Sequence, residues 1–144
     1  MKEYKVEVTK NSTEWYNMEG RRHREDGPAI ELANGDKYYY INGKRHREDG
    51  PATEWASGYK AYYINGKRHR VDGPAVEWEN EYKCYYINDQ RHREDGPAIE
   101  WVNGDKCYFI NGEELTEEEF NSRTKTCEGK VVEIDGVKYK LSKL

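Results

Sequence analysis

The chain has 144 residues, a formal net charge of −4 and an isoelectric point near 5.7. This size is typical of a single domain, and this charge gives no overall basic field that would attract nucleic acid or an anionic membrane surface. No apolar run is long enough to span a bilayer, and the N-terminus lacks the apolar core of a signal peptide. We therefore expect a soluble, cytoplasmic protein.

The apolar content comes from aromatic rather than aliphatic residues. Only 21 of the 144 residues are Leu, Ile, Val or Phe, a fraction that by itself would suggest disorder. The chain also has 13 Tyr and 4 Trp, and each buried aromatic side chain removes about 150–250 Å² from water. This composition favours a thin sheet packed by aromatic side chains over a globule with a deep core.

Residues 1–20 are expected to form N-terminal capping strands. Residues 4–9 alternate in polarity as a strand does. Residues 14–20 imitate the second half of the repeating unit that follows them. Atypical units of this kind are expected at the end of a repeat array, where they cover a sheet edge that would otherwise be exposed.

A 23-residue unit recurs over residues 21–115. Asp-Gly-Pro begins at residues 26, 49, 72 and 95, so each start lies 23 residues after the one before. The four units have the sequences DGPAIELANGDKYYYINGKRHRE, DGPATEWASGYKAYYINGKRHRV, DGPAVEWENEYKCYYINDQRHRE and DGPAIEWVNGDKCYFINGEELTE. A fixed period of this length is typical of a solenoid or another array of stacked units.

Each unit is predicted to be one antiparallel β-hairpin followed by a charged connector. In the first unit, residues 28–32 alternate in polarity, an Asn-Gly pair at 34–35 makes a turn, and residues 37–42 form the return strand. A second Asn-Gly pair at 42–43 turns the chain into the connector at 45–48. Four such units predict an all-β fold, an elongated and twisted meander or solenoid sheet of hairpin repeats.

The last residues, 116–144, are expected to cap the sheet. A Thr-x-x-Glu capping box that starts at Thr116 predicts a short helix over 116–123. Two alternating runs around the turn pair at 135–136 predict a hairpin over 129–141. Together these two elements would cover the exposed edge of the last unit.

The three cysteines, Cys84, Cys107 and Cys127, do not form a disulfide framework. Cys84 and Cys107 occupy the same column of the repeat, and two strand spacings of about 4.8 Å would hold them about 10 Å apart. A disulfide needs Cα atoms within about 7 Å of each other. We therefore expect reduced thiols that fill strand positions.

The unit resembles the MORN repeat, which is also a 23-residue hairpin module. The resemblance is carried by residues 40–46 (YINGKRH), in which an aromatic is followed after two residues by Gly-Lys and then His, and by residues 50–58. Two features differ from the family pattern. The connector has two extra residues, Glu48 and Asp49, and the Gly of the MORN Tyr-x-Gly-x-Trp segment is absent.

Residues 13–115 resemble more closely a MORN-like variant with tandem His-Arg-Glu-Asp-Gly-Pro-Ala units, found in phage and large-virus proteins. The segment 129–139 is similar to the endings of phage proteins. MORN repeats are mostly scaffolding or interaction modules, so the resemblance implies a binding function. For a phage-encoded chain it implies a location in the host cytoplasm and a host protein as the partner.

A His-x-x-Asp pair recurs in every connector, at His23/Asp26, His46/Asp49, His69/Asp72 and His92/Asp95. Histidine and carboxylate groups together could make an acid–base pair or bind a metal. Catalysis needs one constellation of unlike groups, whereas here the same residues repeat. The pairs are therefore expected to close loops, with Asp capping backbone amides and His bonded to a neighbour. Contact with an anion or a partner is the alternative.

Arginines flank each connector histidine and would form a ladder along one edge, at Arg22/Arg24, Arg45/Arg47, Arg68/Arg70 and Arg91/Arg93. The planar guanidinium group suits recognition of carboxylate or phosphate. Glu25, Glu48, Glu94 and the connector aspartates could instead pair with this charge, and surface ion pairs contribute only about 0–1 kcal/mol each. A solvated ladder of ion pairs and a ligand-binding edge both remain open.

Three aromatic columns run along the array: Tyr39/Tyr62/Tyr85/Tyr108, Tyr40/Tyr63/Tyr86/Phe109 and Trp55/Trp78/Trp101. Alternation places the two tyrosine columns on opposite faces. Core packing takes one face, and the other is an interface or a surface of snorkelling side chains. The candidate partner- or ligand-binding residues are Arg45, His46, Arg47, Arg68, His69, Arg70, Arg91, His92, Arg93, Tyr40, Tyr63, Tyr86 and Phe109.

These features predict a non-enzymatic protein-interaction module, such as a phage or viral accessory protein that binds and modulates or inhibits a host protein. One alternative is a protein that binds or sequesters an anionic ligand, such as a nucleotide, through the Arg/His edge. The other is a structural component that assembles into a homo-oligomer. The sequence has no nucleotide-binding loop, nucleophile elbow or zinc-type spacing, so we expect no catalytic residues, metal or cofactor.

Overall fold

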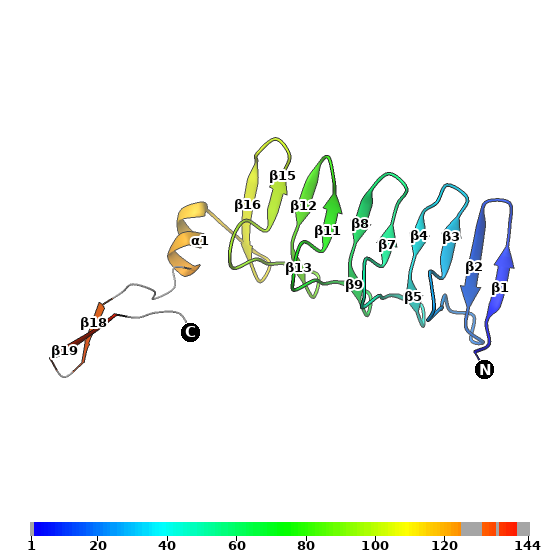
Figure 1. The fold of residues 1–144 in the computed structure, drawn as a ribbon, viewed down its shortest axis with the longest axis horizontal. Helices are drawn as coiled ribbons and strands as arrows, with labels where there is room; N and C mark the ends of the chain where they lie inside the picture. Colours follow the sequence, from blue (N-terminus) through cyan, green and yellow to red (C-terminus); the bar gives the residue numbers. More distant parts are fainter. Residues whose placement is uncertain (1, 125–130, 135, 141–144) are drawn as a thin grey trace.

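The computed structural model describes residues 2–124, 131–134 and 136–140, and its main feature is one long antiparallel sheet (Figure 1). Over these residues, eleven strands hydrogen-bond side by side in the order β1 (Lys5–Val8), β2 (Ser12–Tyr16), β3 (Ile30–Leu32), β4 (Lys37–Tyr38), β7 (Thr53–Glu54), β8 (Tyr59–Ala61), β11 (Val76–Trp78), β12 (Tyr82–Cys84), β15 (Ile99–Trp101), β16 (Lys106–Ile110) and β17 (Glu113–Leu115). The hairpins are ranged along the long axis of the molecule. The all-β hairpin meander expected from the sequence is confirmed.

Each unit also contains a second, smaller hairpin, so the expectation of one hairpin and a connector was incomplete. The return strand predicted over 37–42 is interrupted at Tyr39, and β5 (Tyr40–Ile41) then pairs with β6 (Lys44–Arg45). The same pairing joins β9 (Tyr63–Ile64) to β10 (Lys67–Arg68) and β13 (Tyr86–Ile87) to β14 (Gln90–Arg91). In the last unit β16 runs without a break and pairs with β17. Figure 1 shows these small hairpins at one end of the taller ones.

The two Asn-Gly pairs of a unit form different turns. Asn42 and Gly43 both have positive φ angles, 49° and 80°, and they join two paired strands, as in a two-residue type I′ turn. At residues 34–35 only Gly35 has a positive φ, 95°. That turn is longer, and the Leu32 N–H closes it by donating to the Asp36 carbonyl at 2.9 Å. The second turn of the unit is therefore the tighter of the two.

The core is shallow and runs as columns along the array. Ala29, Ala52, Ala75 and Ala98 are fully buried, and the next residue of each unit (Ile30, Thr53, Val76 and Ile99) is nearly so. Aromatic rings extend this packing toward the turns: the rings of Trp55 and Tyr59 lie 4.3 Å apart, and Tyr59 meets Trp78 edge-on at 6.2 Å. The aromatic side chains thus supply the packing that the few aliphatic residues cannot.

Cys84 and Cys107 are both free thiols. They lie on either side of Ile99 in the sheet register, two strand spacings apart, as predicted. Burial raises the pKa of the Cys84 thiol, so this group stays protonated and weakly nucleophilic at neutral pH. Cys127 lies outside the described residues.

The short helix expected at the C-terminal end is confirmed as α1 (Glu117–Thr124). Its capping box is formed, because the Thr116 N–H donates to Glu119 Oε2 at 2.8 Å and the Glu119 N–H donates to Thr116 Oγ1 at 3.2 Å. The ring of Phe120 packs on Tyr108 of β16 at 4.8 Å. The helix therefore covers the last long strand of the array.

The hairpin expected over 129–141 is present as β18 (Val131–Ile134) paired with β19 (Val137–Lys140). Residues 129, 130, 135 and 141 of that prediction lie outside the described residues. At the other end, β1 falls within the strand expected over 4–9 and pairs with β2.

Candidate functional site

The sheet separates the connector residues onto two faces. The clasp face carries the second arginine of each connector together with the tyrosine column that begins at Tyr39. The aromatic face carries the first arginine of the later connectors together with the column of Tyr40, Tyr63, Tyr86 and Phe109. The predicted Arg/His edge is thus divided between two surfaces.

On the clasp face, Arg47 is held by four contacts at once. Its Nε donates to Asp49 Oδ1 at 2.8 Å, and its Nη1 donates to the Pro51 carbonyl at 3.3 Å and to Glu54 Oε1 at 2.9 Å. The guanidinium group also stacks over the Tyr39 ring, with Cζ 4.0 Å from the centroid. We call this arrangement the arginine clasp. It explains why Arg, Asp, Pro and Glu recur at fixed spacing in the unit.

The clasp recurs with almost the same geometry around Arg24, Arg70 and Arg93. The Nε–Asp distances are 3.0, 2.9 and 2.7 Å, and each Nη1 reaches the proline carbonyl at 3.2 Å. Each Cζ lies 4.0 Å from the centroid of an aromatic ring. For Arg24 that ring belongs to Trp15 of β2, and for the others it belongs to the preceding tyrosine.

The glycine of Asp-Gly-Pro leaves room for the guanidinium group. A Cβ atom added to Gly50 would lie 2.9 Å from Arg47 Cζ, and the same addition at Gly27 would lie 2.9 Å from Arg24 Cζ. Neither glycine has a positive φ, so backbone strain is not the reason for glycine here. The arginine lies flat between an aromatic ring and a Cα without a side chain.

The clasp also fixes the charge of its aspartate. The hydrogen bond from Arg47, followed by the charge of the guanidinium group, holds the pKa of Asp49 below its ordinary value. The same cause, the hydrogen bond from the neighbouring arginine, lowers the pKa values of Asp26 and Asp72. These carboxylates therefore stay ionised well into the acid range.

Each connector histidine bonds to the following unit. The backbone N–H of Asn65 donates to His46 Nδ1 at 3.0 Å, and Asn42, Asn88 and Asn111 make the same bond to His23, His69 and His92 at 3.0, 3.2 and 3.0 Å. An accepting Nδ1 places the proton of a neutral imidazole on Nε2. The expectation that histidine bonds to a neighbour is confirmed. The connector aspartate pairs with the clasp arginine, which the prediction did not include, and a backbone hydrogen bond also contributes to the lowered pKa values of Asp26, Asp49 and Asp72.

On the aromatic face, the arginines have dissimilar partners. Arg45 donates to the hydroxyl groups of Tyr40 and Tyr63, at 3.2 and 3.5 Å. Arg68 donates to Asp89 at 2.8 Å, and Arg91 donates to Tyr86 at 3.3 Å. Within the described part of the chain, Arg45 and Arg91 have no carboxylate partner.

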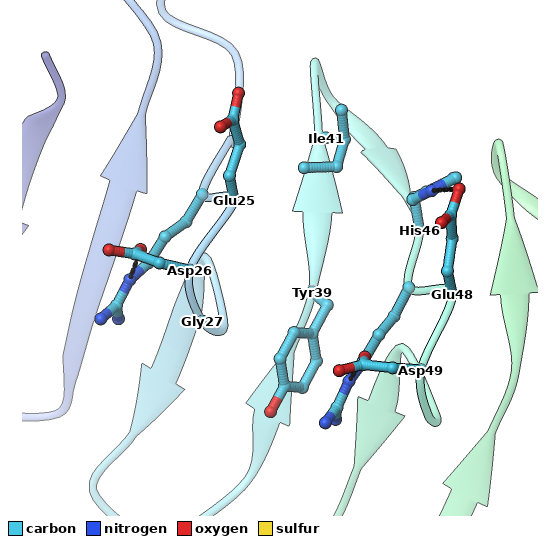
Figure 2. Close-up of a pocket in the computed structure, with 10 residues that line it drawn as sticks. Glu25, Asp26, Gly27, Tyr39, Ile41, His46, Glu48 and Asp49 are labelled. Atoms are coloured by element: carbon cyan, nitrogen blue, oxygen red, sulfur yellow. Dashed lines mark hydrogen bonds and ion pairs between the residues drawn. The ribbon is translucent and has the colours of Figure 1, made fainter. Parts of the chain in front are cut away.

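Between successive clasps, the clasp face has a row of grooves. The first groove, of about 630 Å³, has Tyr39 and Ile41 as its floor, with the Asp26 loop on one side and the Asp49 loop on the other (Figure 2). The second groove, of about 550 Å³, lies over Tyr62 and Ile64. The third, of about 640 Å³, lies over Tyr85 and Ile87. The grooves follow one another at the repeat spacing.

Carboxylates dominate the accessible rim of these grooves. The first groove is lined by Arg24 and Arg47 and by the carboxylates of Glu25, Asp26, Glu48 and Asp49. The side chains of Glu48 and Asp49 are both 85% exposed, whereas Arg47 is 23% exposed inside its clasp. The groove therefore presents aromatic and aliphatic surface below and negative charge at its edge.

Of the residues predicted as candidates, the structure places Arg47, Arg70 and Arg93 in clasps and His46, His69 and His92 between units. It places Arg45, Arg68 and Arg91 with Tyr40, Tyr63, Tyr86 and Phe109 on the aromatic face. The groove floors and rim carboxylates were not among the candidates. The Arg-x-Asp spacing could have predicted the carboxylate rim, because an arginine held by the aspartate two residues after it is partly buried while the carboxylates stay exposed.

The described residues contain no group of three or more His, Cys, Asp or Glu side chains that could hold a metal ion. No helix within the same residues is long and apolar enough to cross a membrane. No protein-family model, curated protein or solved structure matches the chain. Its function therefore has to be inferred from the geometry of the two faces.

Proposed function

We propose that the protein is a non-enzymatic protein-interaction module that docks a partner protein on its clasp face. The observation that carries this proposal is the row of grooves with aromatic floors and exposed carboxylate rims, repeated at the period of the chain. Aromatic residues dominate the energetics of protein interfaces, and rim charges steer a complementary partner. The resemblance to MORN-like repeats, mostly interaction modules, supports the same class.

The rim charges favour a basic partner surface over an anionic ligand on this face. The guanidinium groups of the clasps already have carboxylate, carbonyl and aromatic partners, and a phosphate would have to displace them. An approaching anion would also meet the exposed carboxylates first. A lysine- or arginine-bearing partner would meet opposite charge at the rim.

A photo-crosslinking side chain placed at Glu48, on the groove rim, tests the proposal in the native cells of the protein. The matched control carries the same side chain at Trp55, which is 39% exposed on the aromatic face. We expect one protein to be crosslinked from position 48 and not from position 55. Charge reversal at two other rim carboxylates by Glu25→Lys and Glu94→Lys, which leaves the crosslinking side chain at position 48 in place, should then abolish the crosslink. Equal crosslinking from both faces, or none from position 48, would refute the proposal.

A second candidate, binding of an anionic ligand, is favoured by Arg45 and Arg91 on the aromatic face. In the described part of the chain, Arg45 bonds to the hydroxyl groups of Tyr40 and Tyr63, Arg91 bonds to the Tyr86 hydroxyl and to the Cys84 thiol, and neither arginine has a carboxylate partner. A thermal-shift screen with nucleotides tests this function, and the Arg45→Ala/Arg91→Ala double variant should lose any stabilisation. Stabilisation that persists in the variant would exclude this anion site.

A further inference from the structure

The N-terminal segment before β1 occupies the position of a connector. The pairing of β1 with β2 matches the pairing of β3 with β4. Glu7 of β1 lies opposite Glu14 of β2, and Ile30 of β3 lies opposite Tyr38 of β4. Glu14 and Tyr38 in turn pair with the first residues of the following strands, Ile30 and Thr53. Glu7 therefore corresponds to Ile30. Counting back along the chain from these two positions, Tyr4 corresponds to Gly27, and Lys2 corresponds to Glu25.

The side chains of this segment reach the wall of the next connector. The Tyr4 ring lies 6.0 Å from the His23 ring, and the Tyr4 hydroxyl accepts a hydrogen bond from the Glu25 N–H at 3.3 Å. Lys2 Nζ pairs with Glu25 Oε2 at 2.9 Å. An aromatic side chain and a lysine two residues before it thus lie against a His-x-Glu wall.

The first groove has the same wall without such an occupant. Its wall is formed by His46 and Glu48, which correspond to His23 and Glu25, and the opposite side is the segment of residues 25–27, in which Gly27, at the position of Tyr4, has no side chain. Among the described residues, no partner is found for the Glu48 N–H, the group that corresponds to the donor bonded by Tyr4. The third groove repeats the wall with His92 and Glu94.

We propose that the first and third grooves each bind a tyrosine of a partner protein, which an extended Lys-x-Tyr segment inserts from the open side of the groove, because residues 25–27 and 71–73 fill the backbone positions that residues 2–4 take beside their own wall. The tyrosine ring lies over the groove floor beside His46 or His92, and its hydroxyl accepts the backbone N–H of Glu48 or Glu94. The lysine two residues earlier pairs with the glutamate carboxylate. This inference rests on the proposed docking of a partner protein on the clasp face, and it names the chemistry of that partner.

The second groove supplies a control within the chain. Its wall is His69 followed by Val71, which is 83% exposed and stands where the other walls have glutamate. This groove has the floor, the histidine and the carboxylates of Glu48, Asp49 and Asp72, but it lacks the glutamate two residues after the histidine. Val71→Glu should therefore create a third complete groove, while Val71→Gln should not.

The probe is a synthetic peptide with two Lys-Glu-Tyr units joined by a linker of about 12 Gly and Ser residues. The first and third grooves are four strand spacings apart, about 19 Å, and a linker of this length has a similar root-mean-square span. Joining the units raises the effective concentration of the second unit to the millimolar range. Calorimetry gives the affinity, and backbone amide NMR shifts locate the site.

We expect saturable binding, with amide shifts at Gly27, Glu48 and Glu94. Glu48→Gln and Glu94→Gln should each weaken binding about two- to fivefold, and the control Glu79→Gln, an exposed glutamate that lines none of the three grooves, should leave it unchanged. Val71→Glu should strengthen binding of a peptide with three units. A peptide with Ala in place of Tyr should bind at least about tenfold more weakly, because the ring supplies most of the buried area.

Equal binding of the Tyr and Ala peptides, or amide shifts confined to the aromatic face, would overturn the inference. Crosslinking of a partner from position 48 together with no peptide binding would leave the docking proposal standing and refute the Lys-x-Tyr chemistry alone. Loss of both results would refute both proposals. If position 48 crosslinks only to a second copy of this chain, the occupant is a neighbouring copy and the partner-protein inference fails.

Discussion

The two arginine columns of the connectors have the same period and opposite characters. Arg24, Arg47, Arg70 and Arg93 repeat one set of contacts, with each Cζ 4.0 Å from an aromatic centroid and each Nε within 3.0 Å of an aspartate. The other column has different partners in each unit. Arg22 bonds to a glutamate, Arg45 to two tyrosines, Arg68 to an aspartate and Arg91 to one tyrosine. Two arginine columns with the same period therefore make different kinds of contact on the two faces of the sheet.

The difference shows which arginines define the shape of the unit. A clasp arginine binds the connector loop to the next strand and stacks on an aromatic ring that precedes it in the chain, so the loop is held in the same way in every unit. The other column packs on rings whose neighbours change from unit to unit. Stability should depend mainly on the clasps, and substitutions that separate the two columns test this directly.

The largest effect is expected from replacing a clasp arginine by lysine. Arg47→Lys keeps the charge but loses the planar fork, so hydrogen bonds to Asp49, Pro51 and Glu54 cannot all be kept. We expect the free energy of unfolding to fall by about 2–3 kcal/mol, because the substitution removes hydrogen bonds of a charged donor and the stacking of the guanidinium group on the aromatic ring. Arg45→Lys is the matched control and should cost less than about 1 kcal/mol. Urea denaturation measures both, and equal losses would contradict the division into two columns.

The second-largest loss of stability is expected from replacing the clasp glycine, Gly50. Gly50→Ala places a Cβ 2.9 Å from Arg47 Cζ, and we expect a loss of about 1–3 kcal/mol, as for other overpacked sites. The same substitution in an Arg47→Ala background should cost almost nothing, since the clash partner is gone. Gly66→Ala is the control, because its φ of 84° makes alanine cost about 1–2 kcal/mol whichever arginine is present. A Gly50→Ala cost that is unchanged without Arg47 would show that the glycine serves another purpose.

The sequence was sufficient to predict the sheet and insufficient to predict the clasp. The 23-residue period and the alternation around residues 28–32 determine strands and their order, because these depend on local patterns. The hydrogen-bond partners of Arg47 lie two, four and seven residues after it in the chain, and its stacking partner Tyr39 lies eight residues before it. Only the folded unit brings these groups together. For the same reason, Arg45 and Arg47 were predicted to form one edge although they lie on opposite faces.

A smaller effect is expected from the histidines that join neighbouring units. His46→Phe keeps a ring of similar size but leaves the Asn65 N–H without its acceptor, so we expect a loss of about 1 kcal/mol. Nitrogen NMR of the wild type should show the neutral tautomer with the proton on Nε2, since Nδ1 accepts the Asn65 N–H. His69 provides an internal comparison, because Val71 replaces the glutamate beside its Nε2 while the Asn88 bond remains. A proton on Nδ1 of His46 would contradict the inter-unit bond.

The smallest expected effect is a loss of folding stability as the pH falls into the acid range. Hydrogen bonds from arginine hold the pKa values of Asp26, Asp49 and Asp72 below their ordinary value of about 3.9 in an unfolded chain. Carboxyl groups with a lowered pKa in the folded state stabilise the fold above the unfolded pKa, and this contribution is lost as pH falls through the folded pKa. The urea midpoint should therefore decline below about pH 4.

The triple variant Asp26→Asn/Asp49→Asn/Asp72→Asn tests the source of this decline. Asparagine has no charge to lose, so the variant should be less stable than the wild type at pH 7 and should show a flatter fall between pH 4 and pH 2. Carboxyl carbon shifts of the wild type would show the lowered titrations directly. An unchanged acid slope in the triple variant would assign the decline to other carboxylates, and the clasps would then hold their arginines mainly by stacking and by the bonds to the proline carbonyl and to the glutamate.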